Sequence, residues 1–278
     1  MAPLNALLRP VFDAIQAPMA GWPAWLAVFL WSIPVSVFAL LVFKRFSNQD
    51  RIAAVKDKIF ACLFEIRLFN DDLGAILRAQ KEITGHVLHY QFLSLKPMLW
   101  ILPPVVLIMV QLHGFYGFRG LQPGESVVVV ATVSPNAVEH GEDLRLEAPD
   151  GLVVETPGVW AEDLRQAAWR VRAEKPGDYE LSVVHAGTPH EKRIRVTDRT
   201  VRLAPERPDR SFFGQLEWPS EPPLEADSGL SSITVSYPEA TFSVLGLEME
   251  SQWAWMIAFF VLTMVIALAL KKPMGVEL

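Results

Sequence analysis

The sequence predicts an α-helical integral membrane protein that carries a separate all-β domain. Three windows without a formal charge, 24–43, 97–118 and 253–270, are each long enough to form a transmembrane helix, because about 20 helical residues cross the hydrocarbon core of a bilayer. The segment between the first two windows is charged and has a helical period, whereas the segment after the second alternates like strands. We therefore expect three transmembrane helices, a cytoplasmic antiparallel helical hairpin and an extracytoplasmic β-sandwich.

Residues 1–23, before the first window, predict an amphipathic helix. Its apolar face comprises Leu4, Leu7, Leu8, Val11, Phe12 and Ile15, whereas Arg9, Asp13 and Gln16 lie away from it. Such a helix can lie in the outer interface of a membrane or pack on the outer domain, and the sequence leaves both open. The transmembrane helix at 24–43 contains Pro34, which predicts a kink.

Residues 44–96 contain two runs of apolar residues at three- and four-residue steps, which predict two amphipathic helices. The first run is Ile52, Val55, Ile59, Leu63 or Cys62, and Ile66, and the second is Leu73, Ile76, Gln80, Ile83, Val87 and Tyr90. Asn70, Asp71 or Asp72 can cap the second helix. One narrow apolar seam on each helix favours a coiled coil with Gln80 setting its register. The alternative is that both helices lie on another surface.

The distribution of basic residues predicts the orientation of the chain. Near the ends of the apolar windows, basic residues gather on the side of the hairpin and the C-terminal tail, 271–278, at Lys44, Arg45, Arg51, Lys56, Lys58, Arg78, Lys81, Lys96, Lys271 and Lys272. Because Lys and Arg collect on the cytoplasmic side, we expect the hairpin and the tail there, and the N-terminus and 119–252 outside. In a bacterium this would be the inner membrane, with the β-domain in the periplasm. The range 44–96 holds nine basic and six acidic residues, and 119–250 holds thirteen and twenty-three, so the hairpin suits anionic lipid or ribosomal RNA.

Residues 119–198 read as a small β-sandwich because short alternating segments are separated by turn signals. The expected strands are 126–133, 144–148, 152–156, 166–173, 178–186 and 191–198. "EKPGDYELSV" at 174–183 resembles the turn and strand near the end of immunoglobulin-like domains. The range 199–252 predicts a Pro-rich extended arm, 199–228, that is not packed, followed by a hairpin close to the membrane at 231–250.

No pattern of an enzyme, a metal site or a cofactor site is present in the sequence. It lacks HExxH, CxxC, a phosphate-binding glycine loop and GxSxG. Cys62 is the single cysteine. The pairs His86/His89 and His185/His190 have no third ligand nearby, which favours structural roles. The three apolar windows contain no acidic or basic residue, which argues against ion-coupled transport.

The order of these parts resembles the Oxa/YidC superfamily of membrane-protein insertases, in its small archaeal and endoplasmic-reticulum branch. "LSLKPMLWILPPVVLIMVQL" at 93–112 is the most specific piece. The resemblance implies a hydrophilic groove, for which the candidates are Ser32, Ser36, Lys44, Arg45 and Thr263. It also implies contact of a ribosome or nascent chain with the hairpin, through Arg51, Lys56, Lys58, Arg78 and Lys81. The chain departs from the bacterial insertases because no transmembrane window holds a basic residue.

Two functions follow from this reading, neither of them enzymatic and neither involving DNA. One is an insertase-like factor that assists insertion or assembly of other membrane proteins. The other is a non-catalytic accessory or scaffold subunit that binds partners through the hairpin and the β-domain. A water-accessible cleft at Ser32 and Ser36 would favour the first, and a dry helical bundle the second. A sensor or transport-accessory role is a third possibility.

Overall fold

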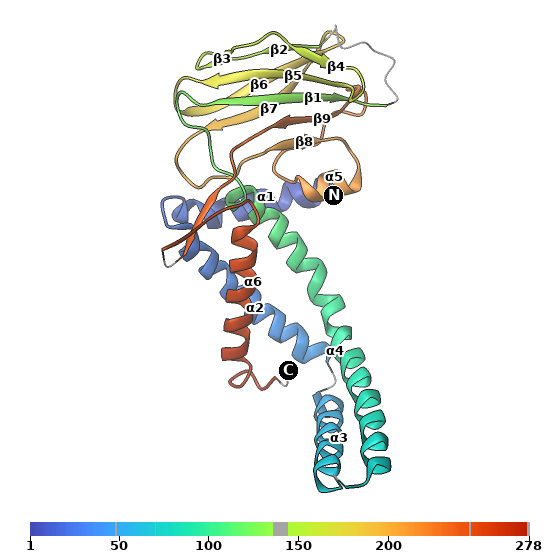
Figure 1. Cartoon of the computed structure of the whole chain (residues 1–278). Coiled ribbons are helices and arrows are strands. Elements are labelled where there is room, and N and C mark those ends of the chain that lie inside the picture. Colours follow the sequence, from blue (N-terminus) through green and yellow to red (C-terminus); the bar gives the residue numbers. More distant parts are fainter. Residues whose placement is uncertain (48, 70, 136–143, 245, 277–278) are drawn as a thin grey trace. The chain divides into compact units, whose positions relative to one another are not determined.

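The computed structural model describes residues 1–47, 49–69, 71–135, 144–244 and 246–276. The chain forms two compact units, which we call the β unit (Met1–Ala27 and Leu107–Ile257) and the helical unit (Val28–Val106 and Ala258–Leu278). The helices are α1 (Ala2–Gln16), the 3-10 turn η1 (Ala17–Met19), α2 (Ala24–Phe46), α3 (Gln49–Leu68), α4 (Leu73–Tyr116), α5 (Phe212–Glu217) and α6 (Ala254–Leu270) (Figure 1).

The strands of the β unit form two main antiparallel sheets and a short hairpin. They are β1 (Ser126–Val133), β2 (Arg145–Glu147), β3 (Leu152–Val154), β4 (Val159–Ala161), β5 (Gln166–Ala173), β6 (Gly177–His185), β7 (Thr188–Val196), β8 (Glu206–Pro208), β9 (Leu230–Val235), β10 (Thr241–Val244) and β11 (Leu247–Glu250). One sheet has the order β3-β5-β1-β9-β8 with β4 also on β5, the second has the order β2-β6-β7, and β10 pairs with β11.

The two main sheets share one hydrophobic core. Alternate residues of β1, such as Val129 and Ala131, point into it with Val171 of β5, and β6 and β7 contribute Leu181 and Ile194 from the other sheet. Strands with a period of two bury one face in this way. The bounds of β1 and β5 agree with the sequence prediction, and the immunoglobulin-like resemblance stays a prediction.

The segment at 199–235 is packed, so the prediction of an unpacked arm is wrong. Leu203 and Leu224 are fully buried in the core that the two sheets share. Strands β8 and β9 extend the first sheet beyond β1, and the predicted hairpin at 231–250 is therefore reduced to β10 and β11. Helix α5 forms one short helix inside the supposed arm, with Ser211 capping its N-terminus through Gly214 N (3.1 Å). The prolines restrict the backbone to extended shapes, but extended backbone also suits an edge strand.

Helix α1 belongs to the β unit and packs against α5 and the end of α4. This agrees with the expectation that residues 1–23 pack on the outer domain. Asn5 donates to the carbonyl of Gln215 in α5 at 2.6 Å. The hydroxyl of Tyr116 donates to Gln16 at 2.8 Å. The opposite face of α1 is apolar and exposed, with Leu7, Val11 and Ile15 at four-residue steps. A position at the membrane interface remains a prediction.

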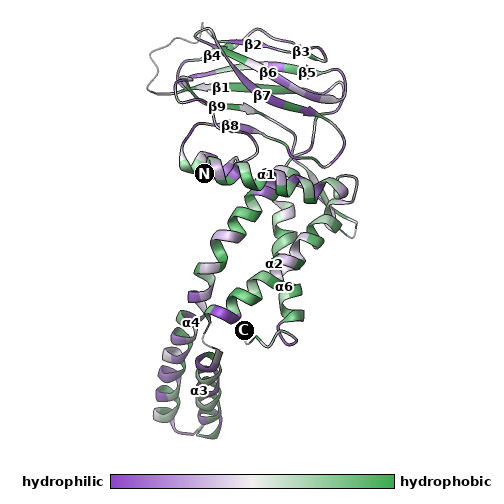
Figure 2. Cartoon of the chain, turned by 180° about the vertical axis from the view of Figure 1, so that it is seen from behind, coloured by the Kyte–Doolittle hydropathy of each residue, from purple (hydrophilic) through white to green (hydrophobic). Residues whose placement is uncertain are grey.

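Helices α2, α3, α4 and α6 contribute to a small core in the helical unit, formed by Leu40, Phe43, Ile52 and Val276 with Tyr90, Leu93, Ile101, Ala267, Leu270 and Met274 around them. Helix α3 and the first half of α4 lie side by side as a hairpin (Figures 1 and 2). Asp72 caps α4 by accepting from the backbone N–H groups of Gly74 (2.8 Å) and Ala75 (3.2 Å), as predicted. Asn70 lies outside the described residues.

The seam of the hairpin differs in part from the prediction. On α3, Cys62 is buried and Leu63 is exposed, which settles the alternative between them. On α4, Ala79 is buried at the seam, whereas Gln80 and Leu73 are exposed. Gln80 therefore does not set the register. The error arises because its neighbour Ala79 is small and satisfies the same spacing equally well.

Two helices, α2 and α4, are long and apolar enough to cross a membrane, by length and composition. Helix α6 is apolar and shorter, with 17 residues. Figure 2 shows hydrophobic residues along most of α2 and α6, whereas α3 mixes both kinds. Helix α4 continues without interruption through Pro97, Pro103 and Pro104, so the hairpin and the second apolar window belong to one helix of 44 residues.

Candidate functional sites

The candidate groove residues Ser32, Ser36 and Thr263 meet in the helical unit. Both serines are fully buried. The hydroxyl of Ser32 donates to Val28 O at 2.8 Å, and that of Ser36 donates to Ser32 O at 2.6 Å and to Thr263 O at 3.0 Å. The hydroxyl groups of both serines are thus satisfied by backbone carbonyls, which apolar surroundings demand, whereas the buried Oγ1 of Thr263 has no hydrogen-bond partner among the described residues. This arrangement counts against an open, wet cleft at the serines.

The two basic candidates at the end of α2 are both exposed. Lys44 Nζ donates to the carbonyl of Met274 at 2.7 Å, in the turn that follows α6. A cation at this point satisfies one of the carbonyl groups left free beyond a helix C-terminus. Lys44 therefore holds the C-terminal turn as part of the fold of the helical unit.

The five basic residues proposed for cytoplasmic contact lie on the hairpin. Arg51, Lys58, Arg78 and Lys81 are exposed, as a contact surface requires. Lys56 is half-buried, and its Nζ lies 5.7 Å from the centre of the Tyr90 ring on α4. This cation–π contact ties the two helices together.

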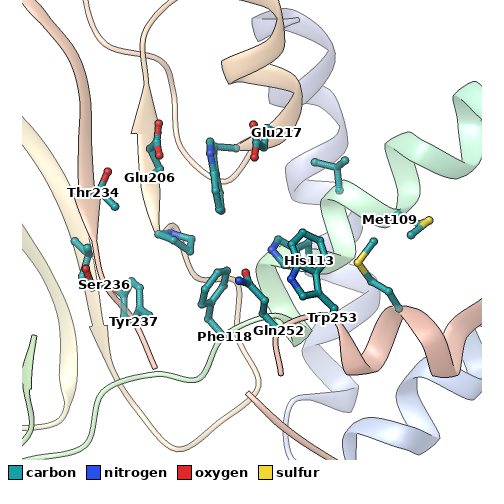
Figure 3. Close-up of a pocket in the computed structure, with 15 residues that line it drawn as sticks. Met109, His113, Phe118, Glu206, Glu217, Thr234, Ser236, Tyr237, Gln252 and Trp253 are labelled. Carbon is teal, nitrogen blue, oxygen red and sulfur yellow. The ribbon is translucent and has the colours of Figure 1, made fainter. Parts of the chain in front are cut away.

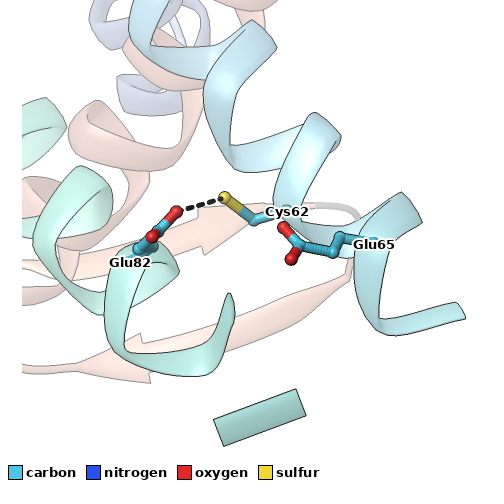
Figure 4. Close-up of side chains that lie close together, drawn as sticks. All are labelled: Cys62, Glu65 and Glu82. Carbon is cyan, nitrogen blue, oxygen red and sulfur yellow. Dashed lines mark hydrogen bonds between the residues drawn. The ribbon is translucent and has the colours of Figure 1, made fainter. Parts of the chain in front are cut away.

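Cys62, Glu65 and Glu82 form a cluster across the hairpin (Figure 4). Their ligating atoms lie within 4.8 Å of one another, a spacing that could hold a metal ion. The Cys62 thiol donates to Glu82 at 3.8 Å. Burial raises the pKa of this thiol, and the charges of Glu82 and Glu65 raise it further. The thiolate needed by a soft metal or a nucleophile is therefore disfavoured, and the contact is a link between the helices.

The outer face of α4 carries an exposed apolar stripe that the sequence prediction missed. It comprises Leu88, Phe92, Leu95 and Leu99, at steps of four, three and four residues. Phe92 exposes 74% of its surface and Leu99 exposes 71%. The stripe starts in the hairpin and runs into the apolar window on the same helix. Helix α3 has a second set, Phe60, Phe64 and Leu68, on its own outer face.

A cavity of about 410 Å³ lies in the β unit (Figure 3). It is lined by the end of α4, strands β8 and β9, the end of α5 and the start of α6, through Met109, Val110, His113, Phe118, Pro205, Glu206, Glu217, Trp218, Thr234, Val235, Ser236, Tyr237, Gln252, Trp253 and Met256. These residues come from separate stretches of the chain between positions 109 and 256, so no local pattern could have indicated the cavity.

Aromatic rings are packed around His113 in the cavity wall. Its ring stacks on Trp253 with centroids 5.5 Å apart and meets Phe118 edge-on at 5.2 Å. Trp218 lies 6.1 Å from His113 and 6.3 Å from Phe118. Gly117 leaves room for this packing, because a Cβ there would lie 2.5 Å from the His113 ring.

Two carboxylates, Glu206 and Glu217, also line the cavity (Figure 3). Burial raises the pKa of Glu206, and the charge of Glu217 raises it further. Lys192 and a hydrogen bond with Thr234 act in the opposite direction. Glu217 is exposed at the rim.

The β unit also contains buried charged pairs. Lys192 is fully buried and donates to Glu221 Oε2 at 2.5 Å and to the carbonyl of Ala204. Burial lowers the pKa of Lys192, and Glu221 opposes that shift. His190 Nδ1 lies 3.0 Å from Glu225, and His185 Nδ1 lies 2.7 Å from Ser228 O. Both histidines are therefore part of the packing, as the sequence favoured.

Arg202 connects three elements of the β unit. It donates to Asp13 of α1 at 2.7 Å and to Gln111 of α4 at 2.9 Å. Its guanidinium lies 4.5 Å from the centre of the Phe115 ring. Burial lowers the pKa of Arg202, whereas Asp13 raises it. These contacts fix α1 beside the end of α4.

Comparison of the chain with protein-family models, curated proteins and solved structures finds no match. The resemblance to the Oxa/YidC superfamily therefore stays a prediction, and the function is argued from the geometry alone.

Proposed function

We propose that the protein is a membrane-embedded accessory subunit that holds an apolar helix of another membrane protein. In this proposal α2, the second half of α4, and α6 span the membrane. The hairpin and the C-terminal tail are cytoplasmic, and the N-terminus and residues 119–252 are outside, following the distribution of Lys and Arg near the ends of the apolar windows. The role is one of binding and positioning, without chemistry.

The observation that carries the proposal is the exposed stripe of Leu88, Phe92, Leu95 and Leu99 on α4. Their spacing is that of one helix face, which suits a partner helix that lies along it. Because the stripe passes from the hairpin into the apolar window, its partner must be apolar over both parts. A helix that itself enters the membrane meets this requirement.

The two helices that are long and apolar enough to cross a membrane, α2 and α4, differ in how much of their apolar window is buried inside the chain. In α2, 44% of the window is buried within the chain, whereas in α4 only 11% is buried. Helix α4 therefore presents far more surface to lipid or to a partner. Helices in membranes associate through close packing and not through the hydrophobic effect, so a partner helix would have to match the shape of this face.

Site-specific photocrosslinking from α4 tests the proposal. A photoreactive residue at Phe92 should capture one transmembrane protein in near-stoichiometric yield, and one at the exposed Gln80 should not. Phe92→Ser and Leu88→Ser should reduce co-purification of that protein while leaving the thermal stability of the chain unchanged, because both side chains are exposed. Crosslinks to lipid alone would contradict the proposal.

An insertase-like factor is the second candidate, favoured by the same exposed apolar residues of the hairpin, which could receive a new hydrophobic segment. The buried, satisfied serines Ser32 and Ser36 argue against it. The two candidates differ in the captured molecules. An insertase would crosslink to many membrane proteins, and only during their synthesis. A subunit would crosslink to one partner at all times.

The proposed topology has its own test. Protease added outside intact cells should cleave exposed positions in the β unit and leave the hairpin turn near Asp71 intact. Cleavage at Asp71 with a protected β unit would invert the topology.

A further inference from the structure

The walls of the cavity in the β unit combine aromatic rings with carboxylates. Most of them are apolar or aromatic, with Phe118, Trp218, Tyr237 and Trp253 around the space. Two carboxylates, Glu206 and Glu217, are the charged groups in the lining. Among the described residues that line the cavity, none is Lys or Arg.

The aromatic rings favour a positively charged guest. The face of an aromatic ring carries partial negative charge, and several rings around one space attract an organic cation strongly once water is excluded. The Tyr237 hydroxyl is already engaged, because it accepts a hydrogen bond from the backbone N–H of Arg195 at 2.9 Å.

The carboxylates exclude other guests. An anion would meet two negative charges without a compensating basic side chain in the wall. A neutral apolar guest would take more water away from the half-buried Glu206 and leave its charge without a counter-ion, although burial and the charge of Glu217 already raise the pKa of Glu206. A metal ion would keep its water shell against apolar walls, because hard cations bind sites rich in oxygen ligands.

We infer that the cavity of the β unit binds an organic ammonium ion, with its cationic group between the aromatic rings and the carboxylates of Glu206 and Glu217. A volume of about 410 Å³ is in the range of small-molecule sites and admits a group of the size of choline or ethanolamine. The same chemistry occurs as a free amine and as the headgroup of a lipid, and Trp253 at the rim exposes 55% of its surface.

Fluorescence titration of the full-length chain tests this inference, because Trp218 and Trp253 report on the cavity. In a detergent without an amine, choline should give a saturable change, and its neutral isostere 3,3-dimethyl-1-butanol should not. Glu206→Gln should weaken choline binding at least tenfold. The matched control is Glu162→Gln, an exposed carboxylate outside the cavity that changes the net charge equally, and it should bind as the unmodified chain does.

The stability of Glu206→Gln separates loss of binding from loss of fold. Because the folded-state pKa of Glu206 is raised, its ionised form opposes folding above that pKa. The variant should therefore unfold at the same or a higher temperature at neutral pH while it loses the ligand.

Nanodiscs identify the source of the ammonium group. A response to free choline assigns the site to soluble amines. A response that requires phosphatidylcholine or phosphatidylethanolamine instead of phosphatidylglycerol, and that Glu206→Gln removes, assigns it to a lipid headgroup. If neither choline nor these lipids gives a saturable response, or if the neutral isostere binds equally, the inference is overturned.

Discussion

The β unit and the helical unit differ in which side chains they bury and in how their buried polar groups are paired. In the β unit, buried charges such as Lys192 and Arg202 have partners far away in the sequence, and the apolar residues of the sheets face inward. In the helical unit, the buried hydroxyls of Ser32 and Ser36 use backbone carbonyls, while large apolar side chains such as Phe92 are exposed. Such a contrast is expected when one unit faces water and the other faces lipid or an apolar partner.

The largest expected effect is at Glu221. Replacing it by Ala leaves the Lys192 ammonium buried without its carboxylate, which should destabilise the β unit by about 3–5 kcal/mol. Chemical denaturation followed by tryptophan fluorescence measures this loss.

The control is Glu174→Ala, whose carboxylate pairs with Arg172 at 3.9 Å on the surface and should contribute at most about 1 kcal/mol. Equal losses in the two variants would break the contrast between buried and exposed pairs.

Arg202→Ala is expected to be next in size, because it removes the hydrogen bonds to Asp13 and Gln111 and the contact with Phe115. Hydrogen bonds to a charged group contribute about 1.5–3 kcal/mol each. Hydrogen exchange should accelerate throughout α1 while β1 stays protected. Arg202→Lys should restore little of this, because an ammonium cannot reproduce the planar guanidinium. Uniform acceleration across both elements would mean that Arg202 supports the whole unit.

Asp72→Ala removes the cap of α4 in the hairpin turn and should cost about 1 kcal/mol. Circular dichroism during thermal unfolding measures the effect. Asp71→Ala is the control, because Asp71 is the adjacent exposed carboxylate. Comparable shifts in the two variants would show that charge at the turn matters and not the cap.

Ser36→Ala should have the smallest effect. It removes a hydrogen bond from α2 to the carbonyl of Thr263 in α6, and bonds between membrane helices contribute on average about 0.6 kcal/mol. Ser32→Ala removes only a bond within α2 and should cost less. Steric-trap unfolding in detergent compares the two variants. A loss above about 2 kcal/mol at Ser36 would mean that the helical unit also depends strongly on buried polar contacts, as the β unit does.

Local patterns were sufficient wherever one face of an element is buried along its whole length. The strands β1 and β5 have the predicted bounds, and in both of them the buried residues alternate along the whole strand. The seam positions Ile52 and Val55 follow from helical spacing in the same way. The choice of Cys62 over Leu63 and of Asp72 as the cap was left open by the sequence and was made by the structure.

Prediction failed where burial depends on distant partners. Leu203 and Leu224 lie in a Pro-rich segment without period, and only the core of two sheets covers them. The prolines indicated an extended chain correctly, but extended backbone can be an edge strand or a free arm, and local sequence does not distinguish the two. The cavity was not foreseen for the same reason, because Glu206 and Trp253 approach His113 only through the fold.

The sequence alone determined most elements and their apolar faces. These are the helices with a period of 3.6, the strands with a period of two, and the turn that contains Asp72. Only the tertiary structure decided which polar groups are paired, which apolar surfaces are left uncovered on α4, and which carboxylates share a cavity with aromatic rings. The physical reason is that periodicity is a property of neighbours in the chain. Pairing of charges and enclosure of space depend instead on residues far apart in the chain, such as Asp13 and Arg202, which are 189 positions apart.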